Sequence, residues 1–150
     1  MLHTMSKMPV ETKKTKIMVF GRFDGLHKGH LDFFKQAKNF TKNSFLVVSI
    51  ARDKNVLKIK GKYPDLKEEA RMKLVKSCQL VDKVILSGIK DHIPHIVKIR
   101  PDIVALGYDQ KNYVKNLKKD LKNKGVLLKI VRLKPFREQI YKNHLLKNKQ

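Results

Sequence analysis

Short, mostly apolar runs alternate along the chain with longer segments in which apolar side chains recur every three or four residues. The short runs predict buried strands at residues 17–20, 45–51, 84–86, 103–106 and 126–131. The recurring segments predict amphipathic helices at 31–40, 66–78, 93–99, 112–124 and 139–146, and Gly125 is the expected cap after the fourth of them. The basic segment that follows residue 51 is interpreted as a loop.

The order strand, helix, strand, helix predicts an α/β fold in which a parallel five-stranded sheet carries helices on both faces. In such sheets, ligands bind beyond the carboxyl ends of the strands. The chemistry is therefore expected in the loops after Phe20, Ala51 and Leu106, which begin GRFDGLHKGH, RDKNVLKIKGK and GYDQ. Since neither a repeat nor a linker rich in Pro, Gly or Ser divides the chain, we expect a flexible N-terminal segment at 1–14 and a single domain at 15–150.

The charge balance points to an anionic partner, because 35 Lys and Arg oppose 13 Asp and Glu and leave a net charge of +22. The excess is greatest at residues 111–150, which carry 13 basic and 2 acidic side chains. A field of this sign attracts phosphorylated ligands, nucleic acid and anionic membranes. Because 29 of the 35 cations are lysines and are not grouped with aromatic residues, a solvated surface is favoured over a nucleic-acid interface.

The sequence contains no targeting or membrane signal of the usual kind. No apolar run approaches the roughly 18 residues of a membrane span, and the first residues lack the apolar core of a secretory signal. Cys78 is the single cysteine, so no internal disulfide is possible. We expect a cytoplasmic protein without membrane insertion.

The segment GRFDGLHKGH places three glycines and two histidines directly after the first predicted strand. Gly21 allows the backbone to turn off the strand, and Gly29 leaves room where a helix that starts near Lys28 approaches a ligand. The free N–H groups and positive dipole end of that helix favour phosphate. His27 and His30 lie on one face of its first turn, where both can donate to phosphate oxygens. A tight turn with two surface histidines and a weak zinc site are the alternatives, and the phosphate cradle is favoured over both.

The segment HKGH matches the HxGH signature of the nucleotidyltransferase superfamily, and GRFDGLHKGH resembles the G-x-F-D-x-x-H-x-G-H version of its cytidylyltransferase-like branch. Further segments follow in the order and spacing of small archaeal FAD synthases and of glycerol-3-phosphate cytidylyltransferases. They are Ala51–Asp53, Lys58–Gly61, Glu69–Arg71, Val81–Asp82 and Pro101–Gln110. The ending ALGYDQ of the last segment is most similar to the FAD synthases. The resemblance covers residues 16–133 and implies a Rossmann-like nucleotidyltransferase fold.

The resemblance implies an enzyme that joins a nucleoside monophosphate from a nucleoside triphosphate to a phosphorylated acceptor and releases pyrophosphate. ATP with FMN, giving FAD, is the favoured pair, and CTP with glycerol 3-phosphate or a similar head group is the alternative. The acceptor phosphate is already ionised at pH 7, so the reaction needs positioning and charge stabilisation more than proton transfer. Mg²⁺ or another divalent cation is expected with the triphosphate, without direct protein ligands, and the family favours a homodimer.

The same resemblance gives each candidate residue a role. The catalytic candidates, which hold the triphosphate or bring positive charge to the phosphates, are His27, His30, Lys60 and Arg71. The nucleotide-binding candidates are Gly21, Arg22, Phe23, Asp24, Gly29, Gly107, Tyr108, Asp109, Arg137 and Asn143. The acceptor-binding candidates are Asp53, Lys58 and Lys60. Composition alone leaves the lysines as solvated charges. At strand ends, the carboxylates of Asp24 and Asp53 can bind magnesium through water, bind the hydroxyls of ribose or cap a turn, and these alternatives stay open.

One late segment departs from the family pattern, in which small hydroxyl residues at a helix start bind the triphosphate. Tyr141, Lys142 and Asn143 stand at the corresponding positions. Lys142 can still supply charge and Asn143 a hydrogen bond, so a different nucleotide pose or weaker activity is one interpretation. A non-enzymatic function is the remaining alternative, a basic nucleotide- or RNA-binding protein that kept the fold.

Overall fold

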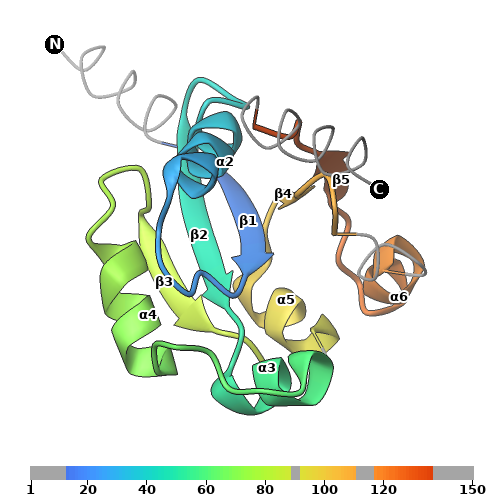
Figure 1. Cartoon of the computed structure of the whole chain (residues 1–150). Coiled ribbons are helices and arrows are strands. Elements are labelled where there is room, and N and C mark those ends of the chain that lie inside the picture. The colour runs from blue at the N-terminus through green and yellow to red at the C-terminus, as the bar shows by residue number, and fades with distance from the viewer. Residues whose placement is uncertain (1–12, 89–91, 111–116, 137–150) are drawn as a thin grey trace, which may run out of the picture.

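The computed structural model describes residues 13–88, 92–110 and 117–136. Five parallel strands form one sheet in the order β3-β2-β1-β4-β5, with helices on both faces (Figure 1). The strands are β1 Thr15–Gly21, β2 Ser44–Ile50, β3 Lys83–Leu86, β4 Ile103–Leu106 and β5 Lys129–Arg132. The predicted α/β fold with a parallel five-stranded sheet is therefore confirmed.

The described helices are α2 Lys28–Lys38, α3 Asp53–Lys60, α4 Glu68–Lys76, α5 Ile93–Ile99 and α6 Leu117–Asn123. Four of the five described helices, α2, α4, α5 and α6, divide between the two faces of the sheet. Side chains of β1 alternate between two cores, because successive residues of a strand point to opposite faces. Ile17 and Val19 pack with α2 and α4, whereas Met18 and Phe20 pack with α5 and α6. A strand buried on both faces produces a continuous apolar run, and this explains why the sequence predicted the central strands well.

The strand order places a topological switch point between β1 and β4. From β1 the chain moves outward to β2 and β3, and it then returns to β4 on the other side of β1 and continues to β5. The loops that follow β1 and β4 therefore leave the sheet in opposite directions and open a crevice at the carboxyl ends of these strands.

The segment interpreted as a loop after β2 is a helix, so that expectation was wrong. Helix α3 has a single buried residue, Val56, and therefore lacks the apolar stripe by which helices are found in a sequence. Its boundaries come from local chemistry instead. Asp53 lies in the positively polarised first turn, and Gly61 ends the helix in the left-handed conformation, with φ 79°.

The last strand begins three residues later than the apolar run at 126–131 predicts. Gly125, at φ 79°, and Val126 close α6 through bonds from Gly125 N to Lys122 O (3.0 Å) and from Val126 N to Leu121 O (2.9 Å). This pattern is a Schellman motif, and it confirms Gly125 as the helix cap. The apolar side chain of Val126 is buried against the helix rather than in a strand, while Leu127 is 80% exposed.

The remaining predicted elements agree with the structure where it describes them. The helices expected at 31–40, 66–78 and 93–99 are α2, α4 and α5, and α6 is the described part of the helix expected at 112–124. The expected terminal helix at 139–146 and most of the N-terminal segment lie outside the described residues. Within the ranges that are described, no helix is both long and apolar enough to cross a membrane. The single-domain division stays a prediction.

Candidate active site

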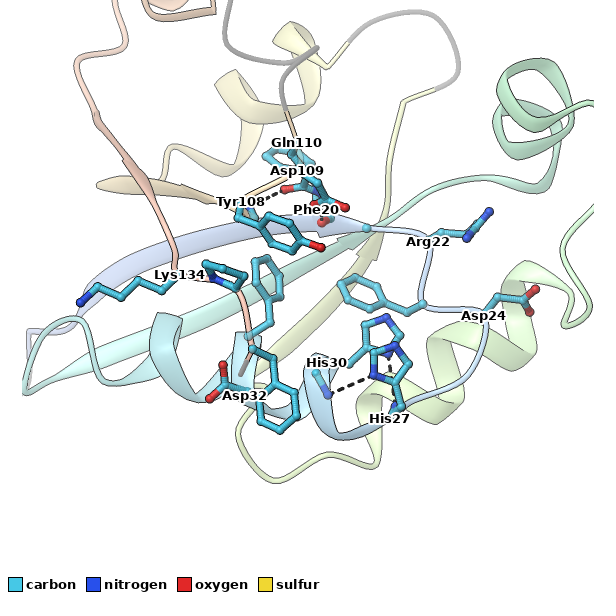
Figure 2. A pocket seen from close by; sticks show the side chains of 17 residues that line it. Phe20, Arg22, Asp24, His27, His30, Asp32, Tyr108, Asp109, Gln110 and Lys134 are labelled. Atoms are coloured by element: carbon cyan, nitrogen blue, oxygen red, sulfur yellow. Dashed lines mark hydrogen bonds between the residues drawn. The ribbon is translucent and has the colours of Figure 1, made fainter. Parts of the chain in front are cut away.

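A cavity of about 420 Å³ lies at the switch point of the sheet, lined from the end of β1, the start of α2 and the segments that follow β4 and β5. Figure 2 shows His27 and His30 on one side of this cavity and Tyr108 and Asp109 on the other. The lining residues are Phe20, Gly21, Arg22, Phe23, Asp24, His27, Gly29, His30, Asp32, Phe33, Gly107, Tyr108, Asp109, Gln110, Lys134, Pro135 and Phe136. The cavity thus contains both predicted histidines and the predicted nucleotide-binding residues that the structure describes.

The two histidines form the N-terminal cap of α2. The Nδ1 atom of His27 accepts a hydrogen bond from the N–H of Gly29 (3.0 Å), and Nδ1 of His30 accepts from the N–H of His27 (3.2 Å). The rings stack with their centroids 3.8 Å apart. A ring whose Nδ1 accepts a hydrogen bond carries its proton on Nε2. Both Nε2–H groups are therefore available as donors to a phosphate in the cavity that the rings line.

The charge of His30 is controlled by burial and by its neighbours. Desolvation first, and then the charges of His27 and Arg22, lower the pKa of His30 from 6.5 to about 4. The ring of His30 is therefore neutral at pH 7. It can act as an oriented dipole whose donor is already in place, which costs no reorganisation when negative charge develops on a phosphate.

The loop between β1 and α2 is held in a strained conformation. Phe23 has φ 51° although its side chain is buried, and a bulky residue at positive φ costs about 1–2 kcal/mol. The ring of Phe23 folds back over Gly21, where a Cβ atom would lie 2.5 Å from two ring carbons. Gly21 is thus required because the Phe23 ring occupies the place of a side chain, a reason that the sequence did not provide.

Asp24 anchors this loop to the segment before α4. Its carboxylate accepts hydrogen bonds from the N–H groups of Asp65 (2.6 Å) and Leu66 (2.7 Å), just before α4. Desolvation acts to raise the pKa of Asp24, but the two backbone hydrogen bonds and the nearby charges of Arg71 and Arg22 outweigh it and lower the pKa. Asp24 lines the cavity, and its carboxylate caps backbone N–H groups, which is one of the roles left open for it by the sequence.

Arg71 anchors the start of the loop from beneath. Its side chain is 0% exposed, and its guanidinium donates to the carbonyl oxygens of Arg22 (2.7 Å) and Leu66 (3.0 Å). It also forms an ion pair with the carboxylate of Asp53 at 2.7 Å. Arg71 therefore contacts the backbone that carries Arg22, and it is absent from the cavity lining.

The acceptor-binding candidates lie outside the cavity in this conformation. The Asp53 carboxylate is engaged by Arg71 and by the N–H of Glu68 (3.2 Å), so that it links the starts of α3 and α4. Lys58 and Lys60 are exposed in the last turn of α3 rather than in a loop. The structure thus does not bring these three residues together with the histidine pair.

The cavity wall includes residues that the sequence did not single out as site residues. Asp32 and Phe33 of α2 and Lys134 after β5 line the cavity. Gln36 of α2 fixes the position of Lys134, because its side chain donates to the Lys134 carbonyl (2.8 Å) and accepts from the Lys134 N–H (2.9 Å). The rule that ligands bind after strand ends could have found Lys134, had it been applied to the last strand as well.

Two predicted nucleotide-binding residues and the possible metal ligands remain to be placed. Arg137 and Asn143, like the whole altered segment around Tyr141, lie outside the described residues. Among the residues that are described, no group of three or more His, Cys, Asp or Glu side chains could hold a metal ion.

Comparisons with known proteins give a consistent result. Residues 18–145 match the cytidylyltransferase-like family. A FAD synthase of Korarchaeum cryptofilum is 42% identical over 81% of this chain and 82% of its own length, and a FAD synthase of Methanosarcina barkeri is 41% identical over 79% and 83%. Among solved structures, the lipopolysaccharide core biosynthesis protein of Thermoplasma volcanium has a TM-score of 0.76 and 34% identity, over 83% of this chain and 99% of that one. Pantoate-beta-alanine ligase of Francisella tularensis, at TM-score 0.53 and 17% identity, shares the fold.

Proposed function

The chain belongs to the cytidylyltransferase-like family, and on that premise we propose that it is a FAD synthase, which transfers the adenylyl group of ATP to the phosphate of FMN and releases pyrophosphate. The observation that carries the proposal within the structure is the pair of stacked histidines, each with Nδ1 bonded to the backbone and Nε2–H left for a phosphate. The identity to curated FAD synthases over most of both chains selects this acceptor and nucleotide from those that the family uses.

The chemistry follows from what the histidines can and cannot do. A phosphate oxygen of FMN forms a bond to the α-phosphorus of ATP while the bond to pyrophosphate breaks, and no proton has to leave the ionised nucleophile. A general base is therefore unnecessary. His27 and His30 donate their Nε2–H groups to the oxygens on which charge develops, and removal of one such donor typically costs about 100- to 1,000-fold in kcat.

The remaining lining residues suit the other parts of the nucleotide. Arg22 is exposed at the start of the loop and brings positive charge to the cavity. Gly107, Tyr108 and Asp109 form the turn after β4, which we assign to the base and ribose. Arg71 acts in this proposal by holding the carbonyl of Arg22 in place rather than by touching phosphate. The roles of Lys58, Lys60 and Asp53 toward FMN stay predictions.

A divalent cation and a dimer belong to the same proposal. The carboxylate of Asp24 already accepts two backbone N–H groups, which makes it a poor metal ligand. We therefore expect the divalent cation to enter bound to the triphosphate, whose charge it neutralises. The exposed side chains of Ile59 (72%) and Tyr63 (60%) offer apolar surface for a second copy of the chain. We expect a cytoplasmic homodimer, and sedimentation equilibrium at micromolar concentration would test the dimer.

The substrate assignment is tested by pairing each triphosphate with each acceptor. Purified protein is incubated with ATP or CTP, with FMN or glycerol 3-phosphate, and with Mg²⁺, and pyrophosphate release is measured together with FAD formation. We expect turnover with ATP and FMN. Turnover with CTP alone would overturn the FAD synthase assignment in favour of a cytidylyltransferase, and the absence of turnover combined with salt-dependent RNA binding would favour a binding protein.

Variants of the site test the mechanism. His27→Ala and His30→Ala should each lower kcat by about 100-fold or more. His30→Gln keeps an acceptor at the third position of the helix and separates the loss of the imidazole from the loss of the cap. Lys60→Ala, compared with Lys62→Ala as an exposed control in the same segment, tests the predicted role of Lys60. An unchanged kcat in both histidine variants would remove them from the mechanism.

A further inference from the structure

The ladder between β1 and β4 ends early, at the place where the cavity opens. β1 pairs with β2 as far as Gly21↔Ile50, and β4 pairs with β5 as far as Leu106↔Arg132. The pairing of β1 with β4 stops at Met18↔Val104. The two central strands therefore separate over their last residues, although their outer neighbours remain paired to the ends.

The side chain of Gln110 occupies the gap between the separated strands. Its Oε1 accepts from the N–H of Gly107 (2.9 Å), and its Nε2 donates to the carbonyl of Phe20 (2.8 Å). If the register of β1 and β4 continued, Phe20 would lie opposite Leu106, and its carbonyl would accept the N–H of Gly107 directly. One side-chain amide thus replaces one backbone hydrogen bond of the ladder. We call this arrangement the amide bridge.

The amide bridge is itself fixed by the turn after β4 and by β5. The N–H of Gln110 donates to the carbonyl of Gly107 (3.1 Å) and closes the turn. Arg132 then donates to the carbonyl oxygens of Gly107 (2.7 Å) and Gln110 (3.0 Å). The guanidinium of Arg132 bonds to both ends of the turn and so holds the backbone of Gln110 in one place. The side chain of Gln110 is therefore already oriented toward the gap.

We infer that Gln110 is a positioning residue that keeps β1 and β4 apart, so that the nucleotide cavity is open before any ligand enters. The inference rests on the proposed function, because it assigns the cavity to a nucleotide. Both amide atoms of Gln110 are engaged by backbone, which favours this role over direct contact with a base. Without the side chain, the N–H of Gly107 and the carbonyl of Phe20 either pair with each other, which narrows the cavity, or remain without their present partners.

The expected signature is a loss of affinity without a loss of turnover. A ligand that binds only the open form has its apparent affinity reduced by the fraction of molecules that are open. Once ATP is bound the cavity is open by definition, so kcat is unaffected. If Gln110→Ala leaves about one molecule in ten open, the Kd and KM for ATP rise about tenfold. A residue that only stabilises the fold would lower the melting temperature without this division between KM and kcat.

The experiment has one arm that needs no substrate. In the ligand-free protein, hydrogen exchange of the Gln110 side-chain NH₂ is followed by NMR and compared with that of Gln79, whose side chain is exposed. Slow exchange at Gln110 is expected, since one of its protons bonds to the Phe20 carbonyl. Exchange as fast as that at Gln79 would overturn the amide bridge, whatever reaction the protein catalyses.

The second arm measures ATP binding and turnover in variants. Gln110→Ala and Gln110→Glu should raise the calorimetric Kd for ATP about tenfold, since a carboxylate at this position can still accept from Gly107 but cannot donate to Phe20. Gln110→Asn should behave in the same way, because its amide is one methylene too short to reach both groups. Gln79→Ala is the control and should bind ATP like the wild type.

The outcomes of the second arm are distinct. A fall in kcat at unchanged KM, or a switch in preference between ATP and CTP, would show that Gln110 contacts the reacting nucleotide and would overturn the positioning role. Unchanged Kd in all three Gln110 variants would overturn it as well. If wild-type protein binds ATP but forms no FAD, the proposed function fails while the Kd comparison still decides the role of Gln110.

Discussion

Replacement of Arg71 by Met should destabilise the protein strongly, because it removes three interactions from a fully buried position. The guanidinium of Arg71 is 0% exposed and bonds to the carbonyl oxygens of Arg22 and Leu66 and to the carboxylate of Asp53. Met fills a similar volume, so the experiment changes charge and hydrogen bonding more than packing. It also distinguishes a positioning role for Arg71 from the phosphate contact that family resemblance predicted.

The magnitude follows from the groups left behind. Removal of one partner of a buried ion pair costs about 3–5 kcal/mol. The Asp53 side chain is 24% exposed and regains some hydration, which reduces the expected cost to about 2–4 kcal/mol. For a chain of this size, about 2–4 °C of melting temperature corresponds to 1 kcal/mol, so a fall of roughly 5–15 °C is expected.

The assay combines thermal unfolding with kinetics. Arg52→Met is the matched control, since Arg52 lies 3.6 Å from Glu68 with 36% of its side chain exposed, and its loss should cost about 1 kcal/mol. Arg71→Met should also weaken ATP binding, because the carbonyl of Arg22 loses its donor and the loop over the cavity relaxes. A melting temperature within about 1 °C of wild type, together with a large fall in kcat, would refute the positioning role.

Two further predictions concern the same loop and the helix that follows it. Burial lowers the pKa of His30 from 6.5 to about 4. As the pH falls, the unfolded chain therefore binds a proton at His30 before the folded chain does. The free energy of unfolding is highest above pH 6.5 and falls as the pH approaches 4. After allowance for the partial exposure of His30 this amounts to about 1–2 kcal/mol, visible as a steeper decline of the urea midpoint between pH 6.5 and 4 in wild type than in His30→Gln; equal slopes would contradict the burial of a neutral ring. Gly21→Ala places a Cβ 2.5 Å from the buried Phe23 ring and should cost about 1–3 kcal/mol and weaken ATP binding. Gly125→Ala, where no atom lies within 4 Å of the added Cβ, should affect stability through its positive φ and leave ATP binding unchanged in calorimetry.

The sequence determined the elements whose signal is carried by neighbouring residues. The central strands were predicted because they are buried on both faces and read as apolar runs, and the start of α2 because glycine and histidine chemistry marks it. Helix α3 was not predicted because Val56 is its single buried residue, so no stripe of apolar residues repeats along it. The start of β5 was misplaced because the apolar side chain of Val126 packs against the end of helix α6 and does not belong to a strand. The spacing of apolar residues indicates which side chains are buried, but it does not indicate which residues they pack against.

The contact between the two histidines could likewise be expected from sequence, because the N-cap residue and the third residue of a helix lie next to each other whatever the rest of the chain does. The tertiary structure alone decided the surroundings. It placed Arg71 beneath the loop rather than in the cavity, brought Lys134 to the cavity wall, and set Gln110 between two strands that run more than eighty residues apart in the chain. Such contacts depend on strand order and on where the ladders end, and these are fixed by long-range packing rather than by any local pattern of residues.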